Sequence, residues 1–486
     1  MKLRELLAGI SVLESNVDLE LNIGEVAYDS RKVTKGSLFV AITGFAVDGN
    51  RFIPMALEKG ASAVVTAVKP QGDIPYVLVE DDRYALALIG CNFFRHPAKD
   101  MTIIGVTGTN GKTSVTLLLK QVLEKITGEK VGLIGTMENQ IGDLVIPAQR
   151  TTPESFELQS LFAQMRSAGC KYVVMEVSSH AISLHRVAGV HFDVAAFTNL
   201  TEDHLDFHKT MEAYCDAKAQ LFCRCDKGVI NADDAWVERI SESATCNLFT
   251  TGVKNISNLT AEDLQLHSDG VSFAAVMNGG RVPVKLPIPG KFTVYNALTV
   301  LGVACQLGIS LECVAEALAD AKGVRGRVEV VPTPGTEYTV LIDYAHTPDG
   351  LENVLSSVKD FCKGRVIAVF GCGGDRDPIK RPIMGRIGVN LSDFAVITSD
   401  NPRTEDPMAI ISDIVKGVEA PQERYTIIEN RRKAIRYAMD KAGKNDIIVL
   451  AGKGHETYQE IQGVKHHLDE REEVAAYLEE VRNTHG

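Results

Sequence analysis

The chain has 486 residues, of which 45% are hydrophobic and 23% charged, and its formal net charge is −12. This acidic balance argues against nucleic acid as the main partner, because phosphate contacts need a basic face. No run reaches the roughly 18 apolar residues that a membrane span requires. The ten cysteines lack paired metal-ligand spacing and the first residues lack an apolar core, so we expect reduced thiols, no signal peptide and a cytoplasmic protein.

The first segment, residues 1–97, is predicted to be a small α/β unit that ends near His96-Pro97. Ser30 lies within a D-S-R sequence, and its residue type alone is most common in turns and helix caps. Short apolar runs separated by turn residues predict strands at Val26–Arg31, Leu38–Ile42, Ala63–Thr66 and Tyr76–Val79.

Residues 98–330 alternate strand-like and helix-like patterns, which is typical of a parallel sheet flanked by helices. Polar residues gather where the strands end, and open α/β sheets bind their ligands at that edge. Continuous apolar runs predict buried strands at Thr102–Thr107, Val131–Ile134, Tyr172–Val177 and Val194–Thr198. Helices are predicted at Pro153–Ser167, Met211–Cys223 and Val294–Leu307.

A glycine-containing loop, Gly108-Thr109-Asn110-Gly111, follows the first of these strands. Lys112-Thr113-Ser114 then open a segment predicted as a helix over Val115–Ile126. The amides of such a loop and of a helix N-terminus bind polyphosphate, a lysine neutralises its charge, and a hydroxyl ligates Mg²⁺. The spacing is not a strict Walker A motif, because a valine stands where the first glycine is required. The loop still predicts an ATP site.

Two polar residues at successive strand ends indicate a metal site beside this loop. Glu176 closes one buried strand within E-V-S-S-H, and His204 follows the next within T-E-D-H-L-D-F-H. Either residue alone is explained as an ordinary satisfied polar group, but both together after a phosphate loop favour Mg²⁺. Lys218, in the predicted helix Met211–Cys223, is by residue type alone a solvated surface lysine.

Residues 331–486 repeat the strand–helix scheme, and a glycine-rich turn, G-C-G-G, follows one strand at residue 370. The sequence therefore predicts an α/β protein with three domains, residues 1–97, 98–330 and 331–486. In the last domain, strands are predicted at Tyr338–Ile342, Val366–Phe370, Phe394–Thr398 and Ile447–Leu450, and helices at Pro348–Phe361, Met408–Val415, Arg431–Ala442 and Glu470–Arg482.

The T-G-T-N-G-K-T loop resembles that of the Mur ligase family of bacterial cell-wall synthesis and its folylpolyglutamate synthetase relatives, which form amide bonds with ATP. The N-terminal D-S-R, G-S-L-F-V-A and D-G-N-R-F-I stretches and Y-C-D-A-K-A-Q-L-F around Lys218 also resemble family patterns, so the resemblance covers essentially the whole chain. It implies a central P-loop ATPase domain with a parallel sheet. A small N-terminal α/β domain binding a UDP-linked muramyl peptide and a C-terminal Rossmann-like domain binding an amino acid would flank it.

The resemblance implies roles for residues that handle ATP. Lys112 and Arg327 are expected to neutralise phosphate charge during catalysis, and Asn296 and Asp343 to contact the nucleotide. Lys218 matches a family lysine that CO₂ carbamylates, which converts a cation into an anionic oxygen ligand. Two Mg²⁺ ions are therefore expected. Their ligands would be Thr113, Glu176, His204 and the carbamate of Lys218.

The resemblance also implies two substrate sites. The D-N-P-R sequence resembles that of family members that add meso-diaminopimelate, whereas without the family it is a plain proline turn. An arginine fork suits the distal carboxylate that lysine lacks, and Asp400 would attract the distal ammonium. The amino acid is expected to contact Arg376, Asp400, Asn401, Pro402, Arg403, Gly452 and Glu456. The UDP-MurNAc-dipeptide is expected to contact Ser30, Thr151, Thr152, Ser178 and Arg186.

The resemblance implies a ligase of peptidoglycan synthesis, and so of cell shape and division, and we expect a monomer. It would phosphorylate the D-Glu side-chain carboxylate of UDP-MurNAc-L-Ala-D-Glu with ATP and join meso-2,6-diaminopimelate to the acyl phosphate. One alternative is a relative that adds lysine to the muramyl peptide or glutamate to folate, against which Arg403 and the D-S-R unit argue. The other is a pseudo-ligase that binds nucleotide as a scaffold, against which the intact Lys112 and Lys218 argue.

Overall fold

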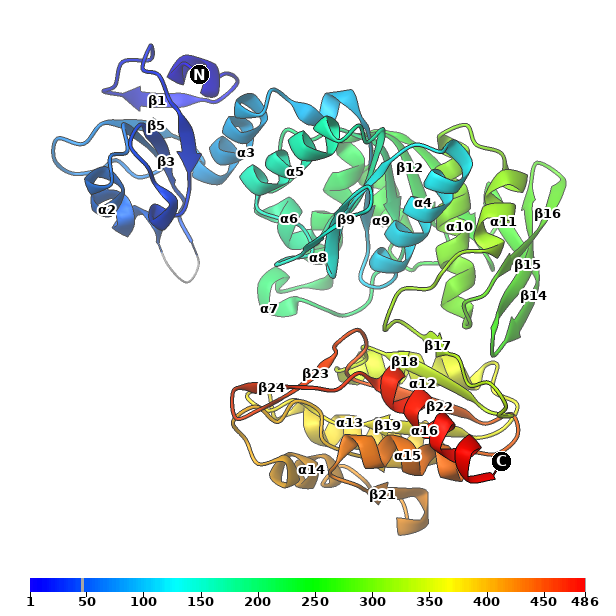
Figure 1. Ribbon diagram of the computed structural model, residues 1–486. Helices are drawn as coiled ribbons and strands as arrows, with labels where there is room; N and C mark the ends of the chain where they lie inside the picture. Colours follow the sequence, from blue (N-terminus) through cyan, green and yellow to red (C-terminus); the bar gives the residue numbers. More distant parts are fainter. Residues whose placement is uncertain (45–47, 486) are drawn as a thin grey trace. The chain divides into compact units, whose positions relative to one another are not determined.

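The computed structural model describes residues 1–44 and 48–485, and the chain divides into two compact units (Figure 1). The first unit contains residues 1–258 and 299–310, and the second contains residues 259–298 and 311–486. Each of the three predicted parts contains an α/β sheet within the described residues, which confirms the expected fold class. The domain bounds at 97/98 and 330/331 stay predictions. No helix within the described ranges is long and apolar enough to cross a membrane.

The N-terminal part of the first unit is a small sheet with strand order β1-β5-β4-β3-β2. Strand β1 runs antiparallel to β5, and the other pairs are parallel. The strand predicted over Val26–Arg31 ends at Ala27, because Asp29 accepts a hydrogen bond from the Arg31 amide and starts a 3₁₀ turn at Ser30. The elements are α1 (Leu3–Leu6), β1 (Val12–Ser15), β2 (Glu25–Ala27), η1 (Ser30–Lys32), β3 (Ser37–Ala41), η2 (Gly49–Phe52), α2 (Ile53–Glu58), β4 (Ala63–Thr66), β5 (Tyr76–Val79), α3 (Asp82–Phe93) and η3 (Pro97–Asp100).

The rest of the first unit contains a mainly parallel sheet with strand order β13-β12-β11-β6-β10-β7-β8-β9. The two hairpin strands β8 and β9 are antiparallel. The elements are β6 (Thr102–Thr107), α4 (Lys112–Thr127), β7 (Val131–Ile134), β8 (Glu138–Ile141), β9 (Leu144–Pro147), α5 (Ser155–Ser167), β10 (Tyr172–Glu176), α6 (Ser179–Ser183), β11 (Phe192–Phe197), α7 (Leu205–His208), α8 (Met211–Ala219), η4 (Gln220–Cys223), β12 (Cys225–Asn231), α9 (Val237–Ser243) and β13 (Asn247–Gly252).

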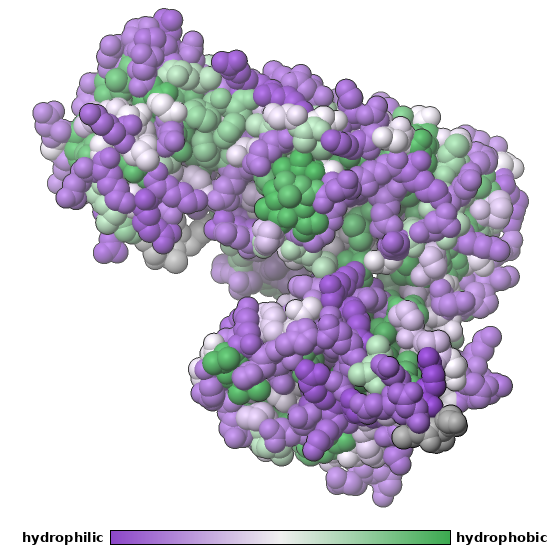
Figure 2. All heavy atoms as spheres, viewed as in Figure 1, coloured by the Kyte–Doolittle hydropathy of each residue, from purple (hydrophilic) through white to green (hydrophobic). Residues whose placement is uncertain are grey.

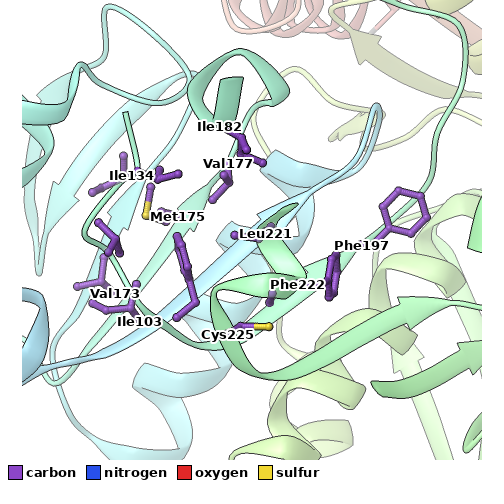
Figure 3. Packing of buried hydrophobic residues seen from close by; sticks show 14 of the residues in the cluster. Ile103, Ile134, Val173, Met175, Val177, Ile182, Phe197, Leu221, Phe222 and Cys225 are labelled. Carbon is purple, nitrogen blue, oxygen red and sulfur yellow. The ribbon is translucent and has the colours of Figure 1, made fainter. Parts of the chain in front are cut away.

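The register of the central strands brings their polar ends together. Strand β6 lies between β10 and β11, with Glu176 opposite Val106 and Phe197 opposite Thr107. Because these strands are parallel, the loops that follow them leave the sheet at one edge. A packed apolar core anchors the strands beneath the site, and Figure 3 shows part of it, including Ile103 and Met175.

Strand β9 lies at one end of this sheet and, within the described residues, pairs with β8 alone. Its Leu144 and Val145 side chains are 61% and 51% exposed. Figure 2 shows a hydrophobic patch over β9, on a face that is otherwise mainly hydrophilic. This end of the sheet is therefore formed by an apolar strand whose side chains are exposed.

The second unit begins with an antiparallel ladder of order β16-β15-β14, and its main sheet has the order β17-β18-β22-β19-β20-β21. The loops after β22, β19 and β20 carry A-G-K-G-H-E, G-C-G-G and D-N-P-R, so parallel pairing gathers these three motifs at one edge. The elements are β14 (Leu259–His267), β15 (Gly270–Met277), β16 (Gly280–Leu286), α10 (Lys291–Gln306, whose first half belongs here), α11 (Leu311–Ala319), β17 (Glu329–Val331), β18 (Thr339–Asp343), α12 (Pro348–Lys359), β19 (Val366–Phe370), α13 (Lys380–Asn390), β20 (Phe394–Ile397), α14 (Pro407–Val415), η5 (Gln422–Arg424), β21 (Tyr425–Ile427), α15 (Arg431–Lys441), β22 (Ile447–Ala451), β23 (Tyr458–Ile461), β24 (Val464–His467) and α16 (Glu470–His485).

Candidate functional site

The predicted phosphate loop connects β6 to α4, as the sequence indicated. Gly108 has a φ of +146°, and a Cβ atom there would lie 1.9 Å from Thr198 Oγ1, so only glycine fits. Thr198 Oγ1 in turn donates to the carbonyl of Asn110 at 2.6 Å. Gly111 adopts a left-handed conformation immediately before α4 begins at Lys112. The loop is thus held in a fixed shape at a helix N-terminus, where backbone amides attract an anion.

Lys112 lies against the loop that it is predicted to serve. Its Nζ donates to the carbonyls of Gly108 and Thr109 at 2.9 and 2.8 Å. Asn110 is fixed from the other side, because its amide donates to Asn199 Oδ1 at 3.0 Å. These contacts place the ammonium group of Lys112 beside the N-terminus of α4, where its charge would neutralise a bound phosphate group.

Glu176 is fully buried at the end of β10 and is held by two threonines. Thr113 Oγ1, in the first turn of α4, donates to Glu176 Oε1 at 3.0 Å. Thr136, which follows β7, donates its amide to Oε1 and its hydroxyl to Oε2, both at 2.9 Å. The predicted metal residues Thr113 and Glu176 are therefore in contact, and the structure adds Thr136, which sequence reasoning missed. Its position just after a predicted strand was a signal that could have found it.

Lys218 is 1% exposed in α8, which overturns the interpretation of a surface lysine that its residue type suggested. Its Nζ donates to the carbonyl of Gly108 at 2.8 Å and lies 4.5 Å from the centroid of the Tyr214 ring. Burial, reinforced by the charge of Lys112, holds the pKa of the Lys218 amine well below its usual range. A neutral amine is the form that reacts with CO₂, so this position suits carbamylation.

His204 lies beside the same aromatic ring. It precedes α7 in a left-handed conformation, and its imidazole centroid is 6.1 Å from that of Tyr214. Tyr214, whose hydroxyl is 3.3 Å from Thr109 Oγ1, thus joins His204, Lys218 and the phosphate loop. Sequence reasoning did not single out this tyrosine.

The donor set fits Mg²⁺ better than a soft metal. A threonine hydroxyl, a carboxylate and the oxygens of a lysine carbamate are hard ligands, and Mg²⁺ keeps several waters in addition to a few protein groups. Within the described ranges, no group of three or more His, Cys, Asp and Glu side chains gathers as a metal cage. Such a cage is not needed when substrate phosphates complete the coordination.

The residues predicted to bind the UDP-linked dipeptide gather mostly at one point. Thr152 Oγ1 donates to the carbonyl of Glu176 and accepts the amide of Ser178 at 3.1 Å. Arg186 Nη1 donates to the carbonyl of Thr152 at 3.2 Å, and the hydroxyl oxygens of Thr136 and Thr151 lie 3.1 Å apart. Thr151 and Thr152 therefore lie beside Glu176, the predicted metal ligand. The remaining predicted residue, Ser30, is buried in the N-terminal sheet region, where its hydroxyl contacts Met55.

The predicted nucleotide residues Asn296, Arg327 and Asp343 belong to the second unit. Asp343 is buried at the end of β18 and accepts the amide of Val328 at 2.8 Å, and burial raises the pKa of its carboxyl. The Arg327 guanidinium lies 5.3 Å from the Tyr344 ring centroid, and Asn296 is buried in α10.

The D-N-P-R segment follows β20 and is built around buried polar groups. Burial would raise the pKa of Asp400, but the nearby charges of Lys453 and Arg431 lower it, and the net shift is downward. Asn401 donates its amide group to Glu456 Oε2 at 2.9 Å and accepts from Lys453 Nζ at 3.1 Å.

The remaining predicted contacts of the amino-acid site also come to this edge. Gly452 has a φ of +115°, and a Cβ atom there would lie 2.5 Å from Asp400 Oδ2, so the carboxylate occupies the space that a larger residue would fill. Pro402 is buried, while Arg376 is exposed and donates to the carbonyl of Asp375. The sequence did not reveal Arg431, a fully buried arginine that pairs with Glu470 at 2.8 Å.

Comparison with known proteins identifies the class to which this site belongs. Models of the Mur ligase family, catalytic domain, of the Mur ligase middle domain, and of the Mur ligase, glutamate ligase domain match residues 22–81, 106–304 and 326–454. Relatives that match 94% and 99% of this chain are 49% and 48% identical to it. The chain therefore belongs to the Mur ligase family. It is therefore a member of a family of ligases, as the phosphate loop and the D-S-R unit predicted.

Individual relatives show which members of the family this chain is similar to. The chain is 49% identical to the UDP-N-acetylmuramoyl-L-alanyl-D-glutamate–2,6-diaminopimelate ligase of Clostridium botulinum, covering 94% of this chain and 96% of the relative. It is 48% identical to the ligase of the same name from Clostridium tetani, covering 99% and 100%. A solved structure with that name superposes with a TM-score of 0.75 at 32% identity and covers 99% of both chains.

Proposed function

We propose that this protein joins meso-2,6-diaminopimelate to the D-Glu side-chain carboxylate of UDP-MurNAc-L-Ala-D-Glu, with conversion of ATP to ADP and phosphate. The choice of amino acid rests on the D-N-P-R segment of the second unit. There Arg403 is partly exposed, and its Nη1 donates to the carbonyl of Gly374 in the G-C-G-G loop at 2.7 Å. A guanidinium in that position suits a distal carboxylate, which lysine does not have. The names of the full-length relatives agree with this assignment.

The reaction has two steps in this proposal. A side-chain oxygen of D-Glu attacks the γ-phosphorus of ATP, the bond to the β-phosphate oxygen breaks, and an acyl phosphate and ADP form. The amine of diaminopimelate then attacks the acyl carbon, loses a proton and expels inorganic phosphate, which leaves the amide. Positioning and charge neutralisation supply most of the catalysis in such phosphoryl transfers.

The chain's own residues have distinct roles in these steps. The amides of Gly108–Ser114 bind the phosphates, Lys112 and Arg327 neutralise the transferring charge, and Asp343 and Asn296 bind the nucleoside. Thr113, Glu176, His204 and the Lys218 carbamate would hold two Mg²⁺ ions, which neutralise phosphate oxygens when bound. The muramyl dipeptide would contact Ser30, Thr151, Thr152, Ser178 and Arg186. Diaminopimelate would contact Arg376, Asp400–Arg403, Gly452 and Glu456.

The hydroxyl of Thr136 should matter to the metal site although it is not a predicted ligand. Thr136→Val removes the donor to Glu176 Oε2 at an exposed position, so the fold should survive. Loss of such an outer contact typically weakens a metal site about 10- to 100-fold. We therefore expect the Mg²⁺ concentration for half-maximal phosphate release to rise by that factor, and Thr136→Ser to restore it. An unchanged Mg²⁺ requirement in the valine variant would show that the hydroxyl does not orient Glu176.

Arg403→Ala tests the choice of amino acid. Breaking one side of a charge pair in a site of this kind costs about 2–5 kcal/mol, or very roughly 30- to 5000-fold. We expect KM for meso-diaminopimelate to rise by a factor in this range while KM for ATP stays near its wild-type value. Discrimination against lysine should shrink, because lysine leaves the wild-type arginine unpaired.

The measurement is amide formation with diaminopimelate and with lysine at matched ATP. If wild type and variant prefer diaminopimelate over lysine by the same ratio, Arg403 does not determine the choice of amino acid. A lysine- or folate-directed relative would instead turn over lysine or a folate substrate with the wild-type chain. A scaffold without activity would release no phosphate when all three substrates are present.

We also propose that the protein acts in the cytoplasm and that it is a monomer.

A further inference from the structure

The turn that carries Arg327 lies against a loop of the amino-acid site. Gly326, directly before it, has a φ of +74°, and a Cβ atom there would lie 2.2 Å from the amide nitrogen of His455 in the A-G-K-G-H-E loop. Only glycine fits such a close approach. The amide of Tyr344, just after β18, donates to the Gly326 carbonyl at 2.9 Å. Arg327 is therefore held between the end of β18 and a loop that carries predicted contacts of the amino acid.

Two ion pairs hold the same turn from either side of Arg327. Arg325, which precedes it by two residues, donates from Nη2 to Asp469 Oδ2 at 2.6 Å. Glu329, which follows it by two residues, accepts hydrogen bonds from Arg471 Nε at 2.7 Å and from Arg471 Nη2. Asp469 and Arg471 lie at the start of α16, and Arg471 Nη1 donates to Asp469 Oδ1 at 3.1 Å. The four side chains therefore form one network that joins the turn to α16.

Arg471 is the member of this network that also reaches the amino-acid loop. Its Nη2 donates to the carbonyl of Gly454 at 3.1 Å, while its partner Glu329 accepts the Gly326 amide at 2.5 Å. The Arg471 and Glu329 side chains are 18% and 23% exposed. A partly buried ion pair is weak evidence for stability, because desolvation offsets much of the Coulomb attraction. The pair is better explained by the geometry that it imposes on the turn and on the loop.

We propose that Arg471 is a positioning residue that holds Arg327 in the orientation required for phosphoryl transfer and ties it to the amino-acid loop. This inference rests on the proposed function and goes beyond it, because it assigns a role that acts through Arg327 and Gly454. Without the guanidinium, Glu329 loses its charged partner and the turn can shift. A displacement of about 1 Å caused far from the chemistry can lower a rate by about 10²-fold.

The test is Arg471→Met, which keeps an apolar stem and removes the guanidinium donors. Its matched control is Arg432→Met. Arg432 also pairs with the start of α16, since it donates to Glu473 Oε2 and to the His467 carbonyl, both at 2.6 Å, and it anchors that helix to α15. Phosphate release from labelled ATP is measured with all three substrates at saturation. We expect kcat to fall about 10- to 100-fold in Arg471→Met and to stay near the wild-type value in Arg432→Met.

A double variant distinguishes positioning from a general loss of structure. In the Arg327→Ala background, Arg471→Met should lower kcat no further, because the group that it positions is already gone. Equal losses in both backgrounds would mean that Arg471 supports the fold alone, and would overturn the inference. The thermal unfolding midpoint of each variant is recorded beside its kcat.

Glu329→Gln keeps the shape of its side chain and weakens the ion pair, so it repeats the test with less disturbance of the fold. It should lower kcat in the same direction as Arg471→Met. KM for meso-diaminopimelate should rise about 3- to 10-fold in Arg471→Met, as for one lost hydrogen bond, and stay unchanged in Glu329→Gln, which keeps the bond to Gly454.

The remaining outcomes separate this inference from the proposed function. A wild-type kcat in both Glu329→Gln and Arg471→Met would overturn the positioning of Arg327. An unchanged KM for meso-diaminopimelate in Arg471→Met would overturn the tie to the amino-acid loop. A wild-type kcat in Arg327→Ala would remove the role on which the inference depends. A wild-type chain that forms no amide with diaminopimelate would overturn the proposed function itself, before any variant is made.

Discussion

Lys218→Ala is expected to leave almost no ligase activity, and short carboxylic acids such as acetate or formate should partly restore it. The side chain is buried beside the phosphate loop, and its amine has a lowered pKa. It is therefore neutral over a wider pH range than a surface lysine and available to CO₂. Alanine removes the carbamate and leaves a space in which a small carboxylate supplies the missing oxygen ligands.

Two further variants make this experiment decisive. Lys218→Arg should be equally inactive and should not respond to carboxylic acids, because a permanent cation then occupies the position of an anion. Lys171→Ala, at an exposed lysine of the same unit, should behave as wild type. Activity of Lys218→Ala near the wild-type level would show that catalysis does not depend on a carbamate at this position. Circular dichroism of each variant checks that the fold is retained.

Lys112→Ala is expected to lower phosphate release by 10²-fold or more, the order of magnitude found when one preorganised charge-stabilising group is removed. Its ammonium lies over the carbonyls of Gly108 and Thr109, at the N-terminus of α4. The charge acts on the phosphoryl group most strongly while that group is being transferred. The loss should therefore be mainly in kcat rather than in KM for the two other substrates.

The measurement is steady-state phosphate release at saturating ATP, with the thermal unfolding midpoint recorded for both proteins. An unchanged midpoint with the expected loss assigns the effect to chemistry. Near wild-type release would show that the loop does not handle the transferred phosphate.

The sequence predicted best the strands in which nearly every residue is buried. Thr102–Thr107 and Val131–Ile134 were placed at their observed bounds, because strands covered on both faces consist of apolar residues throughout. Strands β8 and β23 were missed. Their sequences, E-N-Q-I and Y-Q-E-I, are largely polar, since they form hairpins with one face towards solvent. Helix α13 was missed as well, because its glycine and proline content hides the helical pattern.

The sequence predicted the parts of the candidate site that belong to one local motif or to neighbouring strands. It did not predict contacts between segments that are far apart in the sequence. The contact of Thr113 with Glu176 follows from two adjacent parallel strands, which the strand pattern already indicated. The burial of Lys218 depends on α8 packing beside the Gly108 loop, 110 residues away in sequence. Glu460 meets Arg403 only because a hairpin pairs with a loop 57 residues earlier, and no local pattern encodes that pairing.

The exposed edge of β9 bears on how the purified protein behaves in concentrated solution. An unpaired apolar edge is a template on which a second molecule can add a strand. The net charge of −12 opposes this contact by mutual repulsion. Salt shortens the range of that repulsion, from about 10 Å at 0.1 M to about 3 Å at 1 M ionic strength. Concentrated stocks of this protein should therefore stay clear longest in dilute buffer and turn turbid first in high salt.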